Sequence, residues 1–293
     1  IILAGGAGTR LYPMTKIFSK QLQPIYDKPM IYYPVSLLML AGIKDILIIS
    51  TERDTPLIEN LLGDGSSYGI SISYVVQAEP KGLPEAFVLG ETFIDGDDVT
   101  LILGDNLFYG DLNFLRRAIE DQKKSDRKYS ARIFGYKVDD ARRYGVVEFD
   151  KETREVISIE EKPDNPKSNY AIPGLYIFDG NVATHAKSLK PSSRGETEIT
   201  DLMKKYHEQH QLRTELIGRG VSWLDTGTPQ SLLEAASLIA AVQTSQGLII
   251  GCLEEIAYRR GFLSKSELIE ITEKLPRSPY RQYLERIIHD EVD

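Results

Sequence analysis

The sequence is poor in the residues that mark several common classes of protein. It has one cysteine, Cys252, which excludes an internal disulfide framework, fits a reducing compartment and is best read as a small buried side chain. Of the four histidines, three lie on expected helices and one near the end of the chain, so no histidine metal site is predicted: His185, His207, His210 and His289. No apolar run approaches the roughly 20 residues of a membrane helix, and no signal-peptide pattern is present. We therefore expect a cytoplasmic protein with no membrane partner.

Positive charge is also scarce. Lysine and arginine number 35 against 43 aspartates and glutamates, a formal net charge of −8. Nucleic acids and acidic membrane surfaces select clustered positive charge, so neither is expected as a partner. The 293 residues, 42% of them hydrophobic, suffice for one large α/β domain with a smaller appendage. Because the chain begins at Ile1, inside an expected strand and without Met, we expect that a few residues of the natural protein precede it.

Short apolar runs alternate with helical patterns over the first 110 residues or so. Strands are expected at 1–4, 46–50, 72–77 and 99–104, and their near-continuous apolar character predicts a parallel sheet covered by helices on both faces. Helices are expected at 34–41, ending at Gly42, and at 55–62, with Pro56 in the first turn. Ligands of such sheets bind at the carboxyl ends of the strands, which selects residues 5–10, 77–82 and 104–106.

The pattern changes after about residue 111. One amphipathic helix is followed by strands with alternation at 131–138, 145–149, 156–159 and 174–178, the middle two forming a hairpin. A helix at 198–210, a strand at 214–217 and a helix at 229–242 follow, and 254–289 should be helical, with Ser264 and Ser278 as caps. The expected fold class is therefore α/β: a mostly parallel, Rossmann-like central sheet flanked by helices, a mixed-strand part, and a C-terminal helical appendage over 243–293.

Residues 5–10 read Gly-Gly-Ala-Gly-Thr-Arg directly after the first strand. Such a loop can bring backbone N–H groups to an anion, with Arg10 and Lys20 adding positive charge. The alternative is a tight strand-to-helix turn with a surface arginine. A dinucleotide-binding dehydrogenase is disfavoured, because the third glycine of its fingerprint would fall at Leu11 and no acidic residue follows the second strand near Ser50.

Two short acidic motifs indicate a possible metal site. Asp105 follows an apolar strand, and Asp225 lies in Trp-Leu-Asp-Thr-Gly; together they would suit Mg²⁺ bound to a polyphosphate, although each alone could be a turn former. Glu161 and Lys162 end a further strand and are either a solvated charge pair or ligands of an anion and sugar hydroxyls. Polar and aromatic contacts could come from nearby residues: Tyr144, Gly145, Asn169 and Tyr170.

The run from Leu3 to Leu11, with Pro13, Ser19-Lys20-Gln21 and Pro24, resembles the signature of sugar-1-phosphate nucleotidyltransferases. Further blocks narrow the match to the glucose-1-phosphate thymidylyltransferase family: 26–34, 62–65, 103–106, 143–150, 160–163, 167–171, 194–201, 223–227 and 254–259. The resemblance covers essentially the whole chain. It divides the chain into a nucleotidyltransferase domain at 1–242, with a nucleotide part at about 1–110 and a sugar part at about 111–228, and an assembly or regulatory appendage at 243–293.

The resemblance implies a reaction in which glucose 1-phosphate attacks the α-phosphorus of dTTP in line and pyrophosphate leaves, giving dTDP-glucose. Such a transfer needs positioning and charge neutralisation rather than a covalent enzyme intermediate. The family also implies Mg²⁺ as cofactor, a homotetramer, a place in nucleotide-sugar synthesis such as the dTDP-rhamnose pathway, and feedback by a nucleotide sugar.

The same resemblance assigns roles to residues of this chain. The catalytic group comprises Arg10, Lys20, Asp105 and Lys162, and Mg²⁺ would be held by Asp105 and Asp225. The nucleotide would be bound by Leu3, Gly5, Gly6, Gly8, Thr9, Arg10, Gln77, Gly82 and Asp105, with Gln77 and Gly82 reading the thymine. The sugar phosphate would be bound by Tyr144, Gly145, Glu161, Lys162, Asn169, Tyr170 and Ile172. A regulatory site is expected near Tyr109, Gly110, Arg219, Glu255, Ile256 and Arg259.

Some positions depart from the family pattern. Pro84 and Glu85 replace residues of a common Gly-Leu-Ala-Gln-Ala run beside the base, and Pro173 stands where threonine is frequent. Two alternatives therefore stay open: an enzyme of the same fold that uses UTP or another sugar 1-phosphate, and a non-catalytic protein that binds nucleotide sugars. The second would be indicated by loss of the catalytic and metal set, but all four residues are present: Arg10, Lys20, Asp105 and Asp225.

Overall fold

The computed structural model describes residues 1–6, 8–124, 128–192 and 195–289. The strands are β1 (Ile2–Leu3), β2 (Pro24–Ile25), β3 (Lys28–Pro29), β4 (Asp45–Ser50), β5 (Ser71–Val76), β6 (Val99–Leu103), β7 (Asn106–Tyr109), β8 (Ala131–Lys137), β9 (Gly145–Phe149), β10 (Val156–Glu161), β11 (Tyr170–Ile172), β12 (Leu175–Phe178), β13 (Leu212–Leu216) and β14 (Ser222–Asp225). The α-helices are α1 (Tyr32–Leu40), α2 (Thr55–Leu62), α3 (Glu85–Leu89), α4 (Glu91–Ile94), α5 (Asn113–Gln122), α6 (Val182–Lys187), α7 (Ile199–Glu208), α8 (Pro229–Gln246), α9 (Leu253–Arg259), α10 (Lys265–Lys274) and α11 (Pro279–His289).

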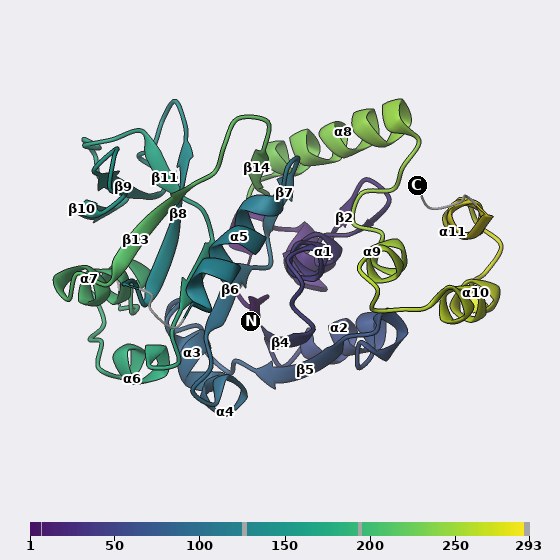
Figure 1. Ribbon diagram of the computed structural model, residues 1–293, viewed down its shortest axis with the longest axis horizontal. Coiled ribbons are helices and arrows are strands. Elements are labelled where there is room, and N and C mark those ends of the chain that lie inside the picture. Colours follow the sequence, from purple (N-terminus) through teal and green to yellow (C-terminus); the bar gives the residue numbers. More distant parts are fainter. Residues whose placement is uncertain (7, 125–127, 193–194, 290–293) are drawn as a thin grey trace.

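The main sheet of the described residues has ten strands, in the order β10-β9-β11-β8-β12-β6-β1-β4-β5, with β13 pairing β8 off this path. Strands β6, β1, β4 and β5 are parallel, whereas β12 is antiparallel to both of its neighbours and β9, β10 and β11 pair antiparallel. The predicted fold class, a parallel core continued by mixed strands, is therefore confirmed. Figure 1 shows the antiparallel strands at one end of the molecule and helices α10 and α11 at the other.

The parallel strands are apolar on both sides because both sides are covered. In β4, Ile46 and Ile48 pack in one buried cluster with Val35 of α1, while Leu47 and Ile49 pack in another with Phe87 of α3. Successive side chains of a strand point to opposite faces, so a continuous apolar run requires a helical layer on each face. Parallel pairing through β4 places the carboxyl ends of β1, β5 and β6, which precede the predicted ligand loops, at one edge of the sheet.

The hairpin predicted between residues 144 and 159 is confirmed as β9 paired antiparallel with β10. The structure extends the second strand to Glu161, whose partner in the register is Gly145. Strand β11 joins the other edge of β9, with Ile172 opposite Gly145. Three residues of the predicted sugar site thus meet at one end of this antiparallel group.

The pairing of β7 with β14 was not predicted from the sequence. The strands are antiparallel, with Asn106 opposite Asp225, so two motifs that are 119 positions apart in the chain lie side by side. The far end of the pair is closed by Gly110, whose φ is +123° and whose position leaves no room for a Cβ against the carbonyl oxygen of Gly220. Only glycine combines that backbone conformation with so close an approach.

The C-terminal helices are anchored to the main core through α9. Leu253, Ile256 and Ala257 belong to the buried cluster that includes α1, and α11 is tied to α9 by the Tyr280 hydroxyl, which donates to Glu254 at 2.5 Å. Ser264 caps α10 through a capping box, as predicted. Cys252 is fully buried, and burial raises the pKa of its thiol, which agrees with its expected structural role.

Several element boundaries differ from the predictions. Helix α7 ends at Glu208, so His210 lies beyond it in a left-handed turn with φ +55°, and its predicted placement on a helix is wrong. Helix α8 continues past residue 242 to Gln246, where Gly247 takes the left-handed cap conformation. The helix on which His185 was expected is α6, whereas α4 was missed because four residues are too few for a clear period. None of the helices in the described parts of the chain is both long and apolar enough to cross a bilayer.

Candidate active site

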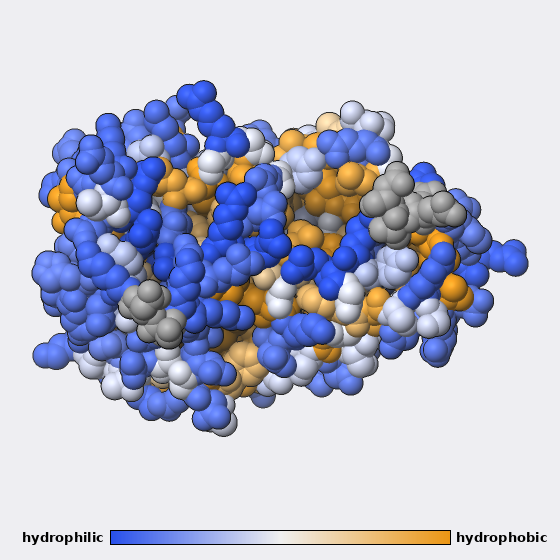
Figure 2. All heavy atoms as spheres, in the orientation of Figure 1, coloured by the Kyte–Doolittle hydropathy of each residue, from blue (hydrophilic) through white to orange (hydrophobic). Residues whose placement is uncertain are grey.

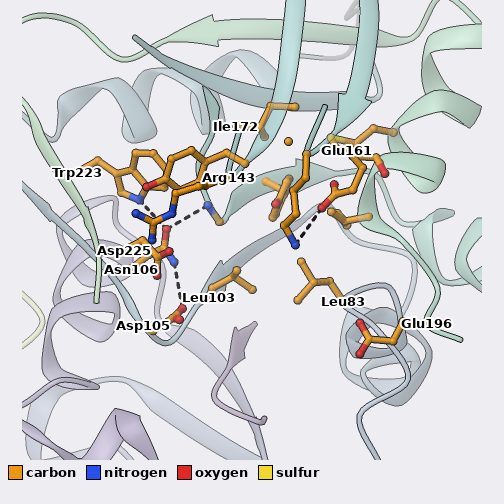
Figure 3. Close-up of a pocket in the computed structure, with 18 of the residues that line it drawn as sticks. Leu83, Leu103, Asp105, Asn106, Arg143, Glu161, Ile172, Glu196, Trp223 and Asp225 are labelled. Carbon is orange, nitrogen blue, oxygen red and sulfur yellow. Dashed lines mark hydrogen bonds and ion pairs between the residues drawn. The ribbon is translucent and has the colours of Figure 1, made fainter. Parts of the chain in front are cut away.

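A cavity of about 710 Å³ opens where the parallel strands end and the antiparallel group begins. Figure 3 shows Asp105, Asn106 and Asp225 on one side of it and Glu161 on the other, with Leu103, Leu83 and Ile172 between them. Among the residues predicted for the site, the following line this cavity: Thr9, Arg10, Asp105, Tyr144, Gly145, Glu161, Lys162, Ile172 and Asp225. Residues from widely separated parts of the sequence therefore converge on one concave surface of a size typical for small-molecule sites.

Asp105 is fixed by its neighbours on the nucleotide side of the cavity. One carboxylate oxygen forms an ion pair with the ammonium of Lys20, and the other accepts a hydrogen bond from Asn106 Nδ2 at 3.1 Å. Burial by itself would raise the pKa of this carboxyl, but the charge and hydrogen bond of Lys20, together with Asn106, hold the pKa below its ordinary value. Asp105 is therefore kept ionised, and its ion pair with Lys20 and its hydrogen bond from Asn106 fix the direction of the carboxylate.

Asn106 is itself held by two buried donors. Its Oδ1 accepts from Trp223 Nε1 at 2.6 Å and from the backbone N–H of Gly174 at 3.1 Å. Trp223 lies on β14 and stacks edge-on against Tyr136 and tilted against Tyr144. Strand β14 thus supports Asp105 through Asn106 in addition to carrying Asp225.

Asp225 faces a different electrostatic environment from Asp105. Burial, followed by the negative charge of Asp105, raises the pKa of the Asp225 carboxyl, and the positive charges of Arg10 and Lys20 only partly offset this. The guanidinium of Arg10 occupies the space that a Cβ on Gly227 would fill, which brings it beside this carboxylate. A half-buried carboxylate next to a second carboxylate is a position that a cation would stabilise.

The two aspartates fit a divalent cation of the Mg²⁺ type. The described residues contain no group of three or more histidine, cysteine, aspartate or glutamate side chains that could hold a metal by themselves. Mg²⁺ commonly takes one or two carboxylates and completes its coordination with water and substrate phosphates. Asp105, held by Lys20 and Asn106, and Asp225 on the strand paired with β7 supply two carboxylates, so the donor set suits a metal that arrives with a polyphosphate.

The opposite side of the cavity carries Lys162 and Glu161 at the end of β10. Their side chains form an ion pair with Nζ and Oε1 3.4 Å apart. Lys162 has φ +43°, a left-handed conformation that is uncommon for a residue with a long side chain. Its N–H donates to the carbonyl of Tyr144 at 3.1 Å, so the strained residue is fixed between β10 and the start of β9. Such strain is often retained at binding sites, where it sets the direction of a side chain.

The glycine loop and the loop after β5 meet beside the cavity. Gln77 is 5% exposed, and its Oε1 lies 2.5 Å from where a Cβ on Gly5 would be. Gly82 has φ +112°, and a Cβ there would overlap the carbonyl oxygen of Thr197. Close approach and backbone conformation together require glycine at position 82, whereas at position 5 a Cβ would meet only the end of the Gln77 side chain. Leu83, in the loop after β5, lines the cavity, so this loop forms part of the cavity wall.

The remaining residues predicted for nucleotide and sugar binding lie outside the cavity lining. Leu3 is buried in β1, Gly6 and Gly8 have positive φ angles in the loop after it, and Lys20 reaches the site through Asp105. The carbonyl of Asn169 accepts from Val138 N at 2.9 Å, and the ring of Tyr170 packs edge-on against Phe149 at 4.9 Å between ring centres.

The residues predicted for a regulatory site lie along two elements. Tyr109 is the last residue of β7, Gly110 follows it, and Arg219 lies in the turn before β14. The Tyr109 hydroxyl donates to Gln246 Oε1 at 3.4 Å. On α9, Arg259 pairs with Glu255 at 2.7 Å, Glu255 also accepts from the Tyr283 hydroxyl, and Ile256 is buried.

Some lining residues were not assigned to the site from the sequence. They are Leu83, Leu103, Asn106, Arg143, Gly174, Tyr176, Glu196, Ile199, Thr200, Met203 and Trp223. Arg143, Glu196 and Thr200 lie inside motif blocks that carried the family resemblance, so the blocks contained a usable signal. Trp223 also lies inside such a block, at 223–227, whereas Tyr176 lies in none of them, and a buried aromatic residue is usually a packing residue.

Comparison with known proteins shows the family to which this chain belongs. The sequence pattern of the nucleotidyl transferase family matches residues 1–242. The chain is 53% identical over 288 residues to a glucose-1-phosphate thymidylyltransferase from Neisseria meningitidis, covering 98% of both chains. The chain belongs to the glucose-1-phosphate thymidylyltransferase family. It is thus an enzyme of the nucleotidyltransferase class.

Other members and solved structures agree with this assignment. A glucose-1-phosphate thymidylyltransferase from Xanthomonas campestris is 51% identical, covering 97% of this chain and 95% of the other. A solved structure from Bacillus anthracis, described as a glucose-1-phosphate thymidylyltransferase in complex with sucrose, has a TM-score of 0.74 at 40% identity, covering 81% of this chain and 93% of that one. A UDP-glucose pyrophosphorylase complexed with UDP-glucose shares the fold, with a TM-score of 0.73 at 24% identity, 82% of this chain and 97% of that one being covered.

Proposed function

We propose that this thymidylyltransferase-family enzyme transfers the thymidylyl group of dTTP to glucose 1-phosphate, releasing pyrophosphate and forming dTDP-glucose. The observation that carries the proposal is the cavity itself, which has Asp105, Asp225 and Arg10 on one side and Lys162 with Glu161 on the other. One side suits a metal-bound polyphosphate and the other a phosphorylated sugar with free hydroxyls. A reaction between the two substrates needs both to be held at once in this arrangement.

The residues act by positioning and by neutralising charge. Lys162 binds the phosphate of the sugar substrate, and Glu161, in the adjacent position, accepts hydrogen bonds from sugar hydroxyls. Arg10 and Lys20 bring positive charge to the triphosphate side, Lys20 by fixing Asp105. Holding the attacking oxygen and the α-phosphorus in line contributes most of the acceleration expected for such a transfer, so no protein nucleophile is required.

Asp105 and Asp225 are proposed to hold Mg²⁺. The metal would neutralise phosphate charge that develops as pyrophosphate leaves. The two aspartates differ in their surroundings. The ion pair with Lys20 keeps Asp105 ionised, whereas the ionised form of Asp225, whose pKa is raised, would be stabilised most by an added cation.

The glycine loop and the loop after β5 are proposed to bind the nucleoside. Gly5, Gly6, Gly8 and Thr9, preceded by Leu3, would surround the nucleotide, while Gln77 and Gly82 would read the base. This is supported by the contact between Gln77 and the Gly5 position and by the positive φ angles of +100° at Gly6 and +56° at Gly8. The sugar is proposed to be contacted by five further residues: Tyr144, Gly145, Asn169, Tyr170 and Ile172.

Assembly and regulation are proposed by analogy with the family. Self-association is supported by the apolar surface that Figure 2 shows below α8 and over α1, and by Leu233 of α8, which is 62% exposed; the number of four subunits rests on the family resemblance. A feedback nucleotide sugar would bind near Tyr109, Gly110, Arg219, Glu255, Ile256 and Arg259. We further propose a cytoplasmic location. We also propose that the chain consists of a nucleotidyltransferase domain at 1–242, with its nucleotide and sugar parts, and an assembly or regulatory appendage at 243–293.

The experiment is a pyrophosphate-release panel with Mg²⁺ present. dTTP, UTP and dCTP are each paired with glucose 1-phosphate, and dTTP is also paired with other hexose 1-phosphates. We expect the highest kcat/KM for dTTP with glucose 1-phosphate. Faster turnover with UTP or with another sugar would assign a different substrate to the same fold. Absence of pyrophosphate with every pair, while dTDP-glucose binds, would indicate a non-catalytic binding protein.

A further inference from the structure

The loop between β5 and α3 contains a hydrogen bond that fixes the amide of Gln77. Its Nε2 donates to Glu85 Oε2 at 2.6 Å, and the same oxygen accepts the backbone N–H of Lys81 at 3.0 Å. Glu85 is the first residue of α3, and its own N–H donates to the carbonyl of Gly82. The Glu85 end of the Gln77–Glu85 contact is therefore held by backbone.

The chemistry of this contact decides which way the Gln77 amide faces. A carboxylate only accepts hydrogen bonds, so the group turned toward Glu85 must be the NH₂ and not the carbonyl oxygen. A glutamine at position 85 carries both a donor and an acceptor, and it would impose the same choice only because the Lys81 N–H holds its oxygen toward Gln77 Nε2. Glu85 is thus a chemical constraint on Gln77 and not only a packing partner.

The other end of the amide is consequently an acceptor that faces the glycine loop. Gln77 Oε1 lies 2.5 Å from the position of a Cβ on Gly5, and it makes no hydrogen bond within the described residues. Gln77 is only 5% exposed, so a ligand bound beside it would remove the remaining water from Oε1. An oxygen left without a donor in that way costs binding free energy. A ligand that presents an N–H to this oxygen restores the bond.

We infer that Glu85 is a positioning residue that sets base specificity, by forcing Gln77 to present its carbonyl oxygen to bases that carry an N–H at ring position 3. Thymine and uracil have this N–H. Cytosine has an unprotonated nitrogen there, and its lone pair would oppose Gln77 Oε1. The inference rests on the proposed use of a pyrimidine nucleoside triphosphate, and it makes no distinction between dTTP and UTP.

The test measures the ratio of kcat/KM for dTTP to that for dCTP, with glucose 1-phosphate held constant. Glu85→Met removes the acceptor at similar length and leaves the Gln77 amide free to turn over. We expect the ratio to fall about ten-fold or more, which corresponds to one buried hydrogen bond, mainly through KM. Glu85→Gln keeps an oxygen for the Lys81 N–H and for Gln77 Nε2, so it should stay within about three-fold of wild type.

Glu79→Gln is the matched control. It removes one negative charge from the same loop, and Glu79 is exposed with no hydrogen bond or ion pair in the parts of the chain that the structure describes. The control should leave the ratio within about two-fold of wild type. An unchanged ratio in Glu85→Met, an equal fall in Glu85→Gln, or an equal fall in Glu79→Gln would each overturn the inference.

A second measurement needs no variant and stays informative if Glu85→Met does not fold. Wild-type enzyme is assayed with dTTP methylated at N3, which lacks the N–H and adds bulk at that atom, and with dTTP methylated at the 3′ oxygen as a size control. We expect a loss of about ten-fold or more in kcat/KM specific to the N3-methyl compound. Equal turnover of dTTP and its N3-methyl form would overturn the inference. If no nucleotide releases pyrophosphate, the proposed function fails instead, which is a separate result.

Discussion

Replacing Trp223 with phenylalanine tests whether β14 supports the carboxylate side of the site. The substitution keeps an aromatic ring beside Tyr136 and Tyr144 but deletes the Nε1–H that donates to Asn106 Oδ1 at 2.6 Å. Asn106 would keep only the Gly174 N–H, and its amide, which donates to Asp105 Oδ1, would be less firmly held. A local loss of both stability and activity is therefore expected.

The magnitude follows from the burial of this bond. Trp223 is 9% exposed and Asn106 is 4% exposed, so little water can replace the lost donor. Removing one partner of a buried hydrogen bond costs about 1–3 kcal/mol, and the smaller ring adds a fraction of a kcal/mol. We expect the free energy of unfolding to fall by about 2 kcal/mol, with Tm lower by about 4 °C. Turnover should fall about ten-fold because Asp105 is less well oriented.

Urea unfolding followed by far-ultraviolet circular dichroism is the appropriate assay, because Trp223 is the only tryptophan and its fluorescence is lost in the variant. Tyr136→Phe is the matched control: it also removes one polar atom from a neighbouring ring, whose hydroxyl donates to the carbonyl of Val221 at 3.1 Å and does not touch Asn106. A Trp223→Phe enzyme within about 0.5 kcal/mol and two-fold of wild type would refute the reasoning. Equal loss of activity in Tyr136→Phe would refute the specific role of Asn106.

Four further changes test other parts of the site. Asp225→Asn should lower turnover by orders of magnitude, yet stabilise the ligand-free protein near neutral pH. Because the pKa of Asp225 is raised in the folded protein, the folded state binds more protons at this residue than the unfolded state does. The unfavourable contribution of Asp225 to stability therefore grows as the pH rises toward the folded-state pKa and vanishes below the unfolded-state pKa. Thermal midpoints at pH 7.5 and 4 check the sign: a variant no more stable at pH 7.5 contradicts it. Asp105→Ala should also lose turnover by orders of magnitude in Mg²⁺, and near-normal rates would remove it from the metal site. Lys162→Ala should raise KM for glucose 1-phosphate more than for dTTP, and the reverse would place this lysine on the other substrate. Gly82→Ala should lower Tm, since a Cβ meets the carbonyl of Thr197 at φ +112°, and unchanged Tm would show that the loop relaxes freely.

The sequence determined the parts of the fold that depend on local pattern. Apolar runs such as that of β4 required burial on both faces, and glycine at position 42, with φ +90°, ends α1 as its chemistry predicts. The glycine loop and the Asp105 turn were also predicted to face a ligand, because ligands of such sheets bind at the carboxyl ends of the strands. The Glu161-Lys162 strand end was a third candidate, and residues of all three segments line the cavity. The family resemblance then joined these segments into one reaction.

The tertiary structure decided which of these segments meet. The pairing of β7 with β14 places Asp225 against Asn106, and no local pattern reports a contact between short strands so far apart in the chain. The opposite effects on the two aspartates arise in the same way, since Lys20 reaches Asp105 while burial and Asp105 itself act on Asp225. The contact between Glu85 and Gln77 is a third case: the sequence showed an unusual residue beside the base loop, and the fold showed which atom it holds. Long-range contacts of this kind depend on packing and burial, which a single sequence does not specify locally.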